Sequence, residues 1–447
     1  MGATAASLNF VLKKLQHSIR RMVGPDVSSS SAPAPAVAGP AGPLIDVKQL
    51  IASLSHEELL RSADEYFSRM TLRSEQCWKP FSNPEHAPHL TRHLGLVLEA
   101  ADLFRGARVI EFGCGTGWLT IGLAQMGCDA IGVDISPAAL ALAREVRGER
   151  EFPRGGKAGF RLYDGRRLPF PDASVDRIVC YDAFHHVPDQ ALTLREFARV
   201  LRPGGRAAFI EPGPEHSKTA ASQAEMANHK VIENDVSMVE VARFAAEAGL
   251  EAPRMLVQFQ RPFVVDVAEF NAWAEKGIPT AQGAPMWKTL GQQLTVGQCF
   301  WIAKGEPVLD SRRRQGLGAV IELRSAHVAQ RRRARVVELE VEVRNTGSAL
   351  WRTDGLAGRV TLGVQLLDAQ GQRLSAGHGR IALPDGPVAP GQSRIVRGTV
   401  ACPQRRDYTL RIDLVAELVA WFSHHGFASP VLLASSDIGE SERSRRA

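Results

Sequence analysis

The chain has 447 residues, of which 44% are hydrophobic and 23% charged, a balance typical of folded globular proteins. A chain of this length exceeds one ordinary hydrophobic core, so two or three domains are expected. No apolar run reaches the ~18 residues that a membrane-spanning helix needs, so the sequence predicts neither a membrane-spanning nor a secreted protein. The formal net charge is +6, but the arginines gather in short clusters that solvated linkers explain better than a nucleic-acid partner.

The six cysteines are scattered and form no C-x-x-C pair. No His/Cys spacing of the zinc type is present either. The sequence therefore predicts reduced thiols in a cytoplasmic protein, and no metal site.

Residues 1–23 are predicted to form a short amphipathic helix, because apolar residues recur at helical spacing between 8 and 22 with lysines and arginines on the other faces. Such a basic helix suits peripheral contact with an anionic inner membrane or docking on a partner. Packing on its own protein, or a frayed terminus, is an equally good interpretation. Residues 24–44 consist mainly of Ser, Ala, Pro and Gly, which predicts a flexible linker.

A folded domain is predicted over residues 45–306. It begins with helical patterns at 50–69 and 86–103, which form a helical cap. Strands then alternate with helices from residue 108 onward, which predicts an α/β fold with a Rossmann-like, mostly parallel sheet and helices on both faces.

The strongest motif is VIEFGCGTGW at residues 109–118, a strand followed by three glycines and a helix at 119–126. Glycines permit a tight turn and let a ligand approach backbone N–H groups. The spacing is G-x-G-x-G, whereas the dinucleotide fingerprint is G-x-G-x-x-G. Glu111 precedes the glycines, and its carboxylate would repel a pyrophosphate but suit a cationic ligand.

Three further strands are each followed by an aspartate. The strand at 130–133 ends at Asp134, which is suitably spaced to accept hydrogen bonds from both hydroxyls of a ribose. The strand at 160–163 ends at Asp164-Gly165, placed to meet an adenine amino group, and the strand at 177–181 leads into Asp182. A single strand-terminal aspartate is more often a helix cap or turn residue, so the prediction rests on the ordered series.

After about residue 306, short runs of period two are separated by turn residues. The runs cover residues 335–345, 359–367, 393–401 and 408–415. They predict an all-β sandwich over residues 307–436, followed by a disordered tail at 437–447. Trp351 and Trp421 are predicted to be core residues rather than sugar-stacking platforms.

These motifs, in this order, resemble the class I S-adenosylmethionine-dependent methyltransferases, and in particular the small-molecule, type 11-like group related to enzymes that methylate quinones and glycans. The resemblance covers about residues 60–305. It implies S-adenosyl-L-methionine as the cofactor. It also implies that the methionine portion is held by Gly113, Gly115 and Gly117. The ribose would be bound by Asp134, and the adenine by Asp164 with Gly165. The carboxylates of Glu111 and Asp182 would lie near the methionine amino group.

Two aromatic residues upstream, Tyr66 and Trp78, are candidates to close over the cofactor, although aromatic residues in such a cap are more often core. His185 and His186 are the candidate catalytic residues, because a hydroxyl acceptor needs a base and an imidazole titrates near neutrality. One of the two histidines could instead anchor the helix predicted at 191–201. A second candidate set, for which solvated polar residues are the alternative, is Glu211, His216, Glu233 and Asp235.

The segment at 341–351, VEVRNTGSALW, is similar to immunoglobulin-like modules of bacterial polysaccharide-processing proteins. The predicted function is therefore O-methylation of a glycan or glycolipid intermediate. The alternatives are methylation of a small metabolite or quinone, and a non-catalytic cofactor-binding scaffold. Methylation of DNA bases is disfavoured, because YDAF at 181–184 lacks the Asn/Asp-Pro-Pro-aromatic arrangement of such enzymes.

Overall fold

The structure is a computed structural model that describes residues 43–152, 154–257, 264–294, 296–331, 334–384 and 386–440. The predicted N-terminal helix, almost all of the predicted linker and residues 441–447 lie outside the described residues. In the part of the chain that is described, no helix has both the length and the apolar composition needed to cross a bilayer.

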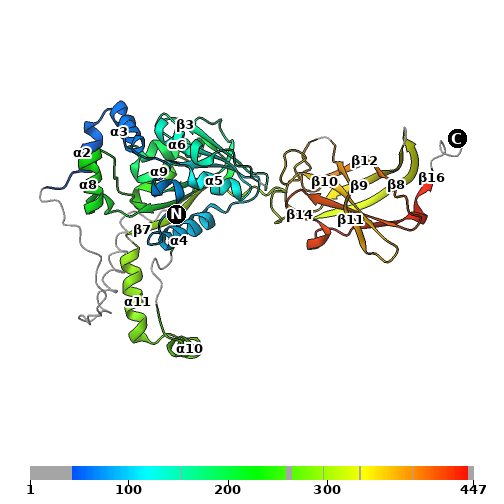
Figure 1. Cartoon of the computed structure of the whole chain (residues 1–447). Helices are drawn as coiled ribbons and strands as arrows, with labels where there is room; N and C mark the ends of the chain where they lie inside the picture. Colours follow the sequence, from blue (N-terminus) through cyan, green and yellow to red (C-terminus); the bar gives the residue numbers. More distant parts are fainter. Residues whose placement is uncertain are drawn as a thin grey trace.

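An α/β body is built around a seven-stranded sheet with the strand order β3-β2-β1-β4-β5-β7-β6 (Figure 1). Neighbouring strands from β3 to β5 pair in parallel, whereas β7 is antiparallel to both β5 and β6. The bounds are β1(Arg108–Phe112), β2(Asp129–Asp134), β3(Lys157–Leu162), β4(Val175–Tyr181), β5(Leu201–Pro212), β6(Arg254–Leu256) and β7(Gly297–Lys304). The predicted Rossmann-like α/β fold is thereby confirmed.

Helices cover both faces of this sheet. Because side chains alternate along a strand, Val109 and Ile110 of β1 belong to different hydrophobic cores. The core around Val109 includes residues of α4(Ala87–Ala101) and α5(Trp118–Gln125), and the core around Ile110 includes residues of α7(Gln190–Val200) and α9(Met238–Glu247). Every residue of β4 is buried, as expected for a strand covered on both sides.

The single helical stretch predicted at 50–69 is two helices, α2(Val47–Ser53) and α3(His56–Ser68). The Ser55 side chain accepts a hydrogen bond from the Glu58 N–H, and the Glu58 carboxylate accepts one from the Ser55 N–H at 2.8 Å. This capping box begins a new helix at residue 56. Helices α6(Pro137–Arg147) and α8(Ala220–His229) follow β2 and β5, respectively.

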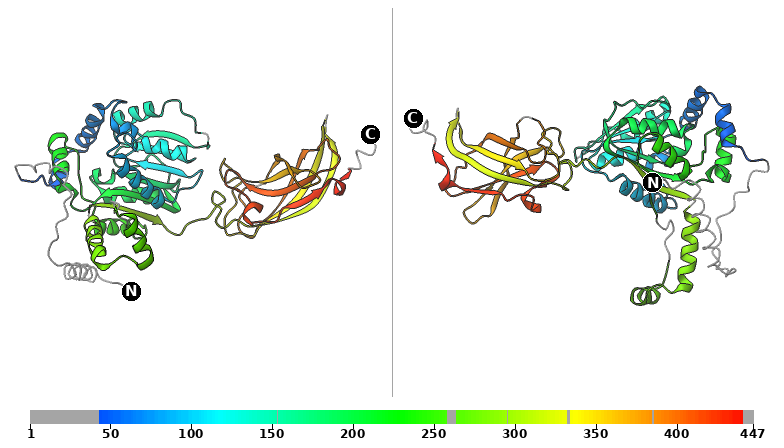
Figure 2. Two further views of the ribbon diagram at one scale, coloured as in Figure 1. Left: turned by 60° about the horizontal axis from the view of Figure 1, so that its bottom comes forward. Right: turned by 180° about the vertical axis from the view of Figure 1, so that it is seen from behind.

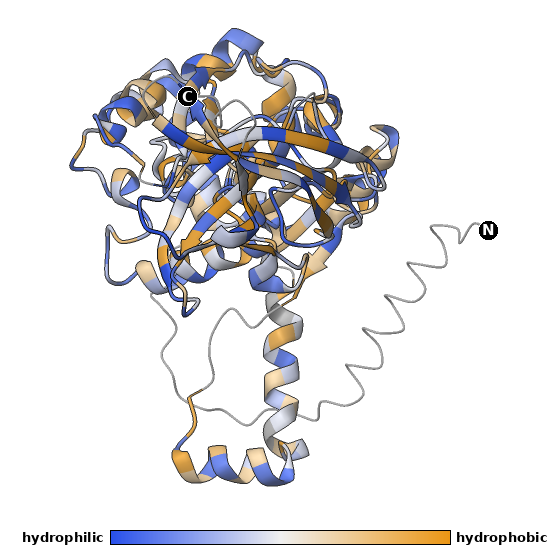
Figure 3. Cartoon of the chain, turned by 90° about the vertical axis from the view of Figure 1, so that its right-hand side faces the viewer, coloured by the Kyte–Doolittle hydropathy of each residue, from blue (hydrophilic) through white to orange (hydrophobic). Residues whose placement is uncertain are grey.

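A pair of helices between β6 and β7 projects from the body (Figures 1 and 3). These are α10(Val267–Lys276) and α11(Thr280–Gln293). No residue of α10 is buried, and Phe270 and Trp287 are 61% and 71% exposed. The pair therefore contributes little to the core.

The C-terminal β region, residues 319–440, contains two sheets. One has the order β11-β10-β13-β14 with β15 also paired to β13, and the other has the order β12-β9-β8-β16. The bounds are β8(Ala319–Arg331), β9(Ala334–Asn345), β10(Val360–Leu367), β11(Arg373–Ala382), β12(Ser393–Ala401), β13(Thr409–Ala416), β14(Ala420–Trp421), β15(Val431–Ala434) and β16(Gly439–Glu440).

One hydrophobic cluster draws on both of these sheets, which is compatible with a β-sandwich. Trp351 is fully buried in it against Phe422, as predicted, whereas Trp421 is half-buried beneath the Arg380 guanidinium at 4.6 Å. Gly439 and Glu440, which the sequence analysis assigns to the tail, pair in parallel with β8.

The C-terminal β region joins the α/β body at one end, as two further views show (Figure 2). Arg313 Nη2 lies 2.8 Å from Asp102 Oδ2, and Arg105 Nη1 lies 2.8 Å from the Leu418 carbonyl oxygen. Asp102 and Arg105 precede β1, so the contact lies at the amino ends of the parallel strands.

Candidate cofactor and acceptor site

A cavity of about 600 Å³ lies at the opposite, carboxyl ends of the parallel strands. The strand order reverses between β1 and β4, and in open α/β sheets ligands bind outside the carboxyl ends at such a point. Eight of the predicted site residues line the cavity, namely Glu111, Gly113, Gly115, Asp134, Gly165, Asp182, His185 and His186. Gly117 and Asp164 do not line it.

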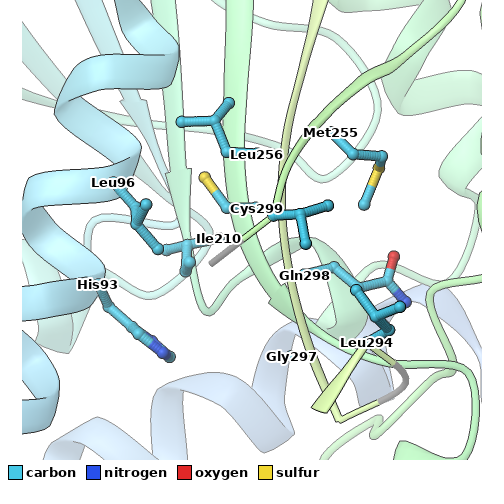
Figure 4. A pocket seen from close by; sticks show the side chains of 10 residues that line it. His93, Leu96, Ile210, Met255, Leu256, Leu294, Gly297, Gln298 and Cys299 are labelled. Atoms are coloured by element: carbon cyan, nitrogen blue, oxygen red, sulfur yellow. The ribbon is translucent and has the colours of Figure 1, made fainter. Parts of the chain in front are cut away.

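A second hollow, of about 40 Å³, lies between α4 and the strands β5, β6 and β7 (Figure 4). Its walls include Leu96, Ile210, Leu256 and Cys299. That volume has room for about one to three water molecules but not for a cofactor. The larger cavity is therefore the candidate site.

The turn after β1 brings backbone to the cavity surface. Gly115 has φ +48°, and a Cβ built on it would lie 3.2 Å from the Phe67 ring. Gly113 has φ +66°, and its Cβ would lie 2.5 Å from the Ala183 Cβ. Larger residues would therefore strain the turn and narrow this end of the cavity.

Gly117 is closely packed by protein atoms. It begins α5 at φ +74°, and a Cβ there would lie 2.5 Å from the Phe160 ring and 2.9 Å from the Ala143 Cβ. Close packing of α5 against β3 and α6 therefore favours glycine at this position, and contact of Gly117 with the methionine portion stays a prediction.

Asp134 braces the turn as well as lining the cavity. Its Oδ2 accepts the Gly115 N–H at 2.8 Å, and its Oδ1 accepts the Ser136 N–H at 3.0 Å. Burial raises the pKa of Asp134, and these two hydrogen bonds oppose that rise. Each carboxylate oxygen keeps a further lone pair with which it could accept a hydroxyl group.

Two other carboxyl groups face the cavity. Glu111 is buried, accepts a hydrogen bond from the Thr120 hydroxyl, and has its pKa raised by burial to about 8. Asp182, at φ +48° after β4, lines the cavity and is exposed to it. Desolvation by the surrounding protein and the charge of the Glu211 carboxylate raise the pKa of Asp182 to about 6. A bound cation would favour the ionised form of both groups.

Asp164 is exposed, and its Oδ1 accepts the N–H groups of Arg166 and Arg167 at 2.8 and 2.7 Å. Although burial tends to raise it, these bonds hold the pKa of Asp164 below its usual value. Its observed contacts are those of a turn residue, and its neighbours Tyr163 and Gly165 line the cavity whereas Asp164 does not. Adenine binding by Asp164 stays a prediction.

Helix α3 covers the cavity. Tyr66 and Phe67 line it, and Asp64 holds the helix in place, because its Oδ1 accepts the Ser136 hydroxyl at 2.7 Å and the Ala138 N–H at 2.8 Å. Sequence reasoning missed Phe67, although it sits next to a candidate in the same helical pattern. Trp78, by contrast, does not line the cavity; its indole N–H donates to the Leu72 carbonyl.

The turn after β4 is fixed by a buried carboxylate, Glu211 of β5. It accepts the N–H groups of Ala183, Phe184 and His185 at 2.9–3.2 Å, and its Oε2 lies 2.8 Å from His185 Nδ1. Burial lowers the pKa of His185 well below its usual value, so the imidazole is neutral. With Nδ1–H donating to Glu211, Nε2 is left as the acceptor nitrogen.

His186 and the segment after β5 complete this wall. His186 Nδ1 lies 2.6 Å from the Ile232 carbonyl oxygen, and His216 Nε2 lies 2.6 Å from Glu233 Oε2. The His185 ring centroid is 3.9 Å from that of His186 and 4.8 Å from that of His216. Asp235 of the second predicted set does not line the cavity; it accepts hydrogen bonds from Ser217.

These residues fit S-adenosylmethionine. The backbone at Gly113 and Gly115 forms a cradle that side chains would fill, and Asp134 has acceptor capacity for ribose hydroxyls. Glu111 and Asp182 could offset the positive charge of the cofactor. The cofactor supplies a methyl group on a sulfonium, which is an excellent leaving group.

Comparison with known proteins adds the decisive observation. A family model described as a methyltransferase domain matches residues 110–209. The 27-O-demethylrifamycin SV methyltransferase of Amycolatopsis mediterranei is 31% identical over 200 residues, which cover 42% of this chain and 71% of that protein. The chain belongs to the S-adenosylmethionine-dependent methyltransferases.

Two further methyltransferases are similar to this chain, one in sequence and one in structure. The ubiquinone biosynthesis O-methyltransferase of Bordetella avium is 31% identical over 189 residues, which cover 40% of this chain and 76% of that protein. Among solved structures, the geranyl diphosphate C-methyltransferase of Streptomyces coelicolor is 15% identical, with a TM-score of 0.38 over 55% of this chain and 96% of that one.

Proposed function

We propose that this methyltransferase transfers the methyl group to a hydroxyl of a small, largely apolar molecule. The observation that carries the proposal is the cavity of about 600 Å³, a size typical of sites that enclose small ligands. It is covered by α3 on one side and by the segment after β5 on the other. A polymer would need an open groove instead.

The lining of the cavity supports an apolar acceptor with a reactive polar group. Near the histidines, the walls include Leu59, Val187, Pro188, Pro212 and Ile232. Apolar walls with a few placed polar groups are typical of small-molecule sites. The relatives also support oxygen as the acceptor atom, because they are named for methylation of a demethylrifamycin and for O-methylation in ubiquinone biosynthesis.

In this proposal, Gly113, Gly115 and Asp134 hold the cofactor, and His185 with His186 assists the loss of the acceptor proton. Methyl transfer is an in-line displacement, so positioning of the acceptor and exclusion of water account for much of the rate. Glu211 acts through His185, because its hydrogen bond holds the ring in one orientation.

A glycan acceptor stays a prediction of the sequence analysis. No side chain of the described part of the C-terminal β region lines the cavity, and Leu418 of that region contacts Arg105 at the opposite end of the sheet.

The test is a methyl-transfer assay with isotope-labelled S-adenosylmethionine and a panel of hydroxylated aromatic compounds, quinols and soluble polysaccharides. Mass spectrometry of the products should detect one added methyl group on a hydroxyl of a ring compound. His185→Gln should lower kcat at least about tenfold, whereas His229→Ala, a histidine outside the cavity, should leave kcat unchanged. Transfer to polysaccharide alone would overturn the proposal.

A further inference from the structure

We infer that His185, His186 and Glu233 hold a divalent transition-metal ion that binds the acceptor oxygen. The inference rests on the proposed function, because it states how the two histidines assist loss of the acceptor proton. The sequence predicts no metal site, since Glu233 lies far from the histidines along the chain and the cysteines form no ligand pair.

The three side chains converge in the structure. One ring nitrogen of each histidine and one carboxylate oxygen of Glu233 all lie within 4.8 Å of one another. Imidazole and carboxylate ligands lie about 2.0–2.2 Å from a zinc ion, which places tetrahedral ligand atoms roughly 3.4 Å apart. Small shifts of the three side chains toward a bound ion would close that difference.

The hydrogen-bond partners of these three side chains are typical of a metal site. A histidine that binds a metal donates its other ring N–H to a carboxylate or a backbone carbonyl. His185 Nδ1 has Glu211 Oε2 at 2.8 Å, and His186 Nδ1 has the Ile232 carbonyl at 2.6 Å. Glu233 is itself held by His216 at 2.6 Å. Each candidate ligand is therefore oriented by a second hydrogen bond.

The set leaves room for a substrate. All three side chains line the main cavity, so two imidazoles and one carboxylate would occupy only part of the coordination sphere. Sites with three protein ligands and an open position are catalytic, whereas closed sets of four are structural. Two histidines with one carboxylate suit Zn²⁺ and Fe²⁺ in particular.

At this position the ion would act as a Lewis acid. The acceptor hydroxyl binds the ion and loses its proton to water at the cavity mouth. The resulting oxyanion forms the new oxygen–carbon bond as the bond between carbon and sulfur breaks, and that electron pair stays on sulfur. No oxidant or reductant is needed.

The test uses the full chain without a histidine tag, stripped by a chelator and titrated with Co²⁺. We expect one ion per chain, with the visible absorption bands of protein-bound Co²⁺, and displacement by Zn²⁺. His186→Ala and Glu233→Gln should each weaken Co²⁺ binding by more than tenfold. His216→Ala, which removes the hydrogen-bond partner of Glu233 and a ring that contacts His185, should weaken it about 10- to 100-fold.

His229→Ala is the matched control, because His229 lies near Glu233 in sequence but does not line the cavity; its Co²⁺ binding should equal that of the wild type. Circular dichroism and S-adenosylhomocysteine binding check that each variant is folded. Co²⁺ binding that survives both His186→Ala and Glu233→Gln would overturn the inference.

Activity separates this inference from the proposed function. Full methyl transfer to a hydroxyl in the presence of chelator, without Co²⁺ or Zn²⁺ binding, would overturn the metal site and leave O-methylation intact. Stoichiometric metal binding by the triad, without transfer to any hydroxyl compound, would support the site and contradict the proposed function.

Discussion

Two carboxyl groups at the candidate cofactor site hold their protons more tightly than free side chains do. The pKa of Glu111 is raised to about 8 by burial, and that of Asp182 to about 6 by burial and by Glu211. Since the α-ammonium group of S-adenosylhomocysteine would favour the ionised forms of both carboxyl groups, its binding should release protons. Affinity for S-adenosylhomocysteine should therefore rise with pH and level off above about pH 8.

Calorimetry between about pH 5 and pH 9 measures this effect, and each proton released contributes up to about a tenfold change in affinity per pH unit. Glu111→Gln should remove the part of the rise between pH 6 and 8 and leave the part due to Asp182. An affinity that does not change with pH would contradict the assignment of these two residues to the ammonium group of the ligand.

The sequence predicts the roles of some residues of the site better than those of others. Asp134 was predictable because it ends a strand at a fixed distance from the glycines. Glu211 was predicted only as a member of the second candidate set, because its position in β5 does not reveal that it accepts three N–H groups of a turn 26–28 residues away. The convergence of Glu233 with His185 and His186 depends on the path of the chain after β5, which no spacing rule encodes.

At the scale of elements, helix α5 offers a matched pair of glycines. Gly117→Ala would place a Cβ 2.5 Å from the Phe160 ring at φ +74°, whereas a Cβ at Gly122 meets nothing within 4 Å. We expect Gly117→Ala to lower the free energy of unfolding by at least about 1–3 kcal/mol. Gly122→Ala should raise it by about 0.5–1 kcal/mol.

Urea denaturation of both variants measures these changes. Equal stabilities would show that α5 does not pack against β3 as closely as the structure has it. A Gly117→Ala variant that keeps its stability but loses cofactor binding would contradict the packing role and favour direct contact with the ligand.

Helices and strands were predictable where apolar and polar residues recur with a regular period. The run at 393–401 is β12, and the strand predicted at 177–181 is β4 extended by two residues. Strand β11 was missed because most of its residues are exposed, so its sequence has no alternation of apolar and polar residues. Helices α2 and α3 were merged although the Ser55–Glu58 capping signal is present in the sequence.

At the scale of the whole molecule, a buried ion pair ties the segment before β8 to the α/β body. Arg312 lies 2.8 and 2.9 Å from the two carboxylate oxygens of Asp176, and both side chains are less than 10% exposed. Although burial tends to raise it, hydrogen bonds and charge from Arg312 hold the pKa of Asp176 below its usual value. The sequence analysis counted this arginine cluster as a solvated linker.

Arg312→Ala should destabilise the protein by about 1.5–3 kcal/mol, because it removes two charged hydrogen bonds from a buried carboxylate whose remaining cationic partner is Arg202 at 3.0 Å. Arg312 stabilises the ionised form of Asp176, so this contribution to stability is present above the pKa of an unfolded aspartate and is lost as the pH falls. The substitution should therefore lower the free energy of unfolding less at acidic pH than at neutral pH. Arg397→Ala, which breaks an exposed pair with Glu340, should change little. Denaturation at neutral and acidic pH compares the three proteins.

Calorimetric titration of S-adenosylhomocysteine tests the cofactor site directly. The wild type should bind one molecule per chain with micromolar affinity, and Asp134→Ala should bind at least about tenfold more weakly, since a hydrogen bond to a charged group contributes about 1.5–3 kcal/mol. No binding to folded wild type, or equal binding by the variant, would contradict the site described here.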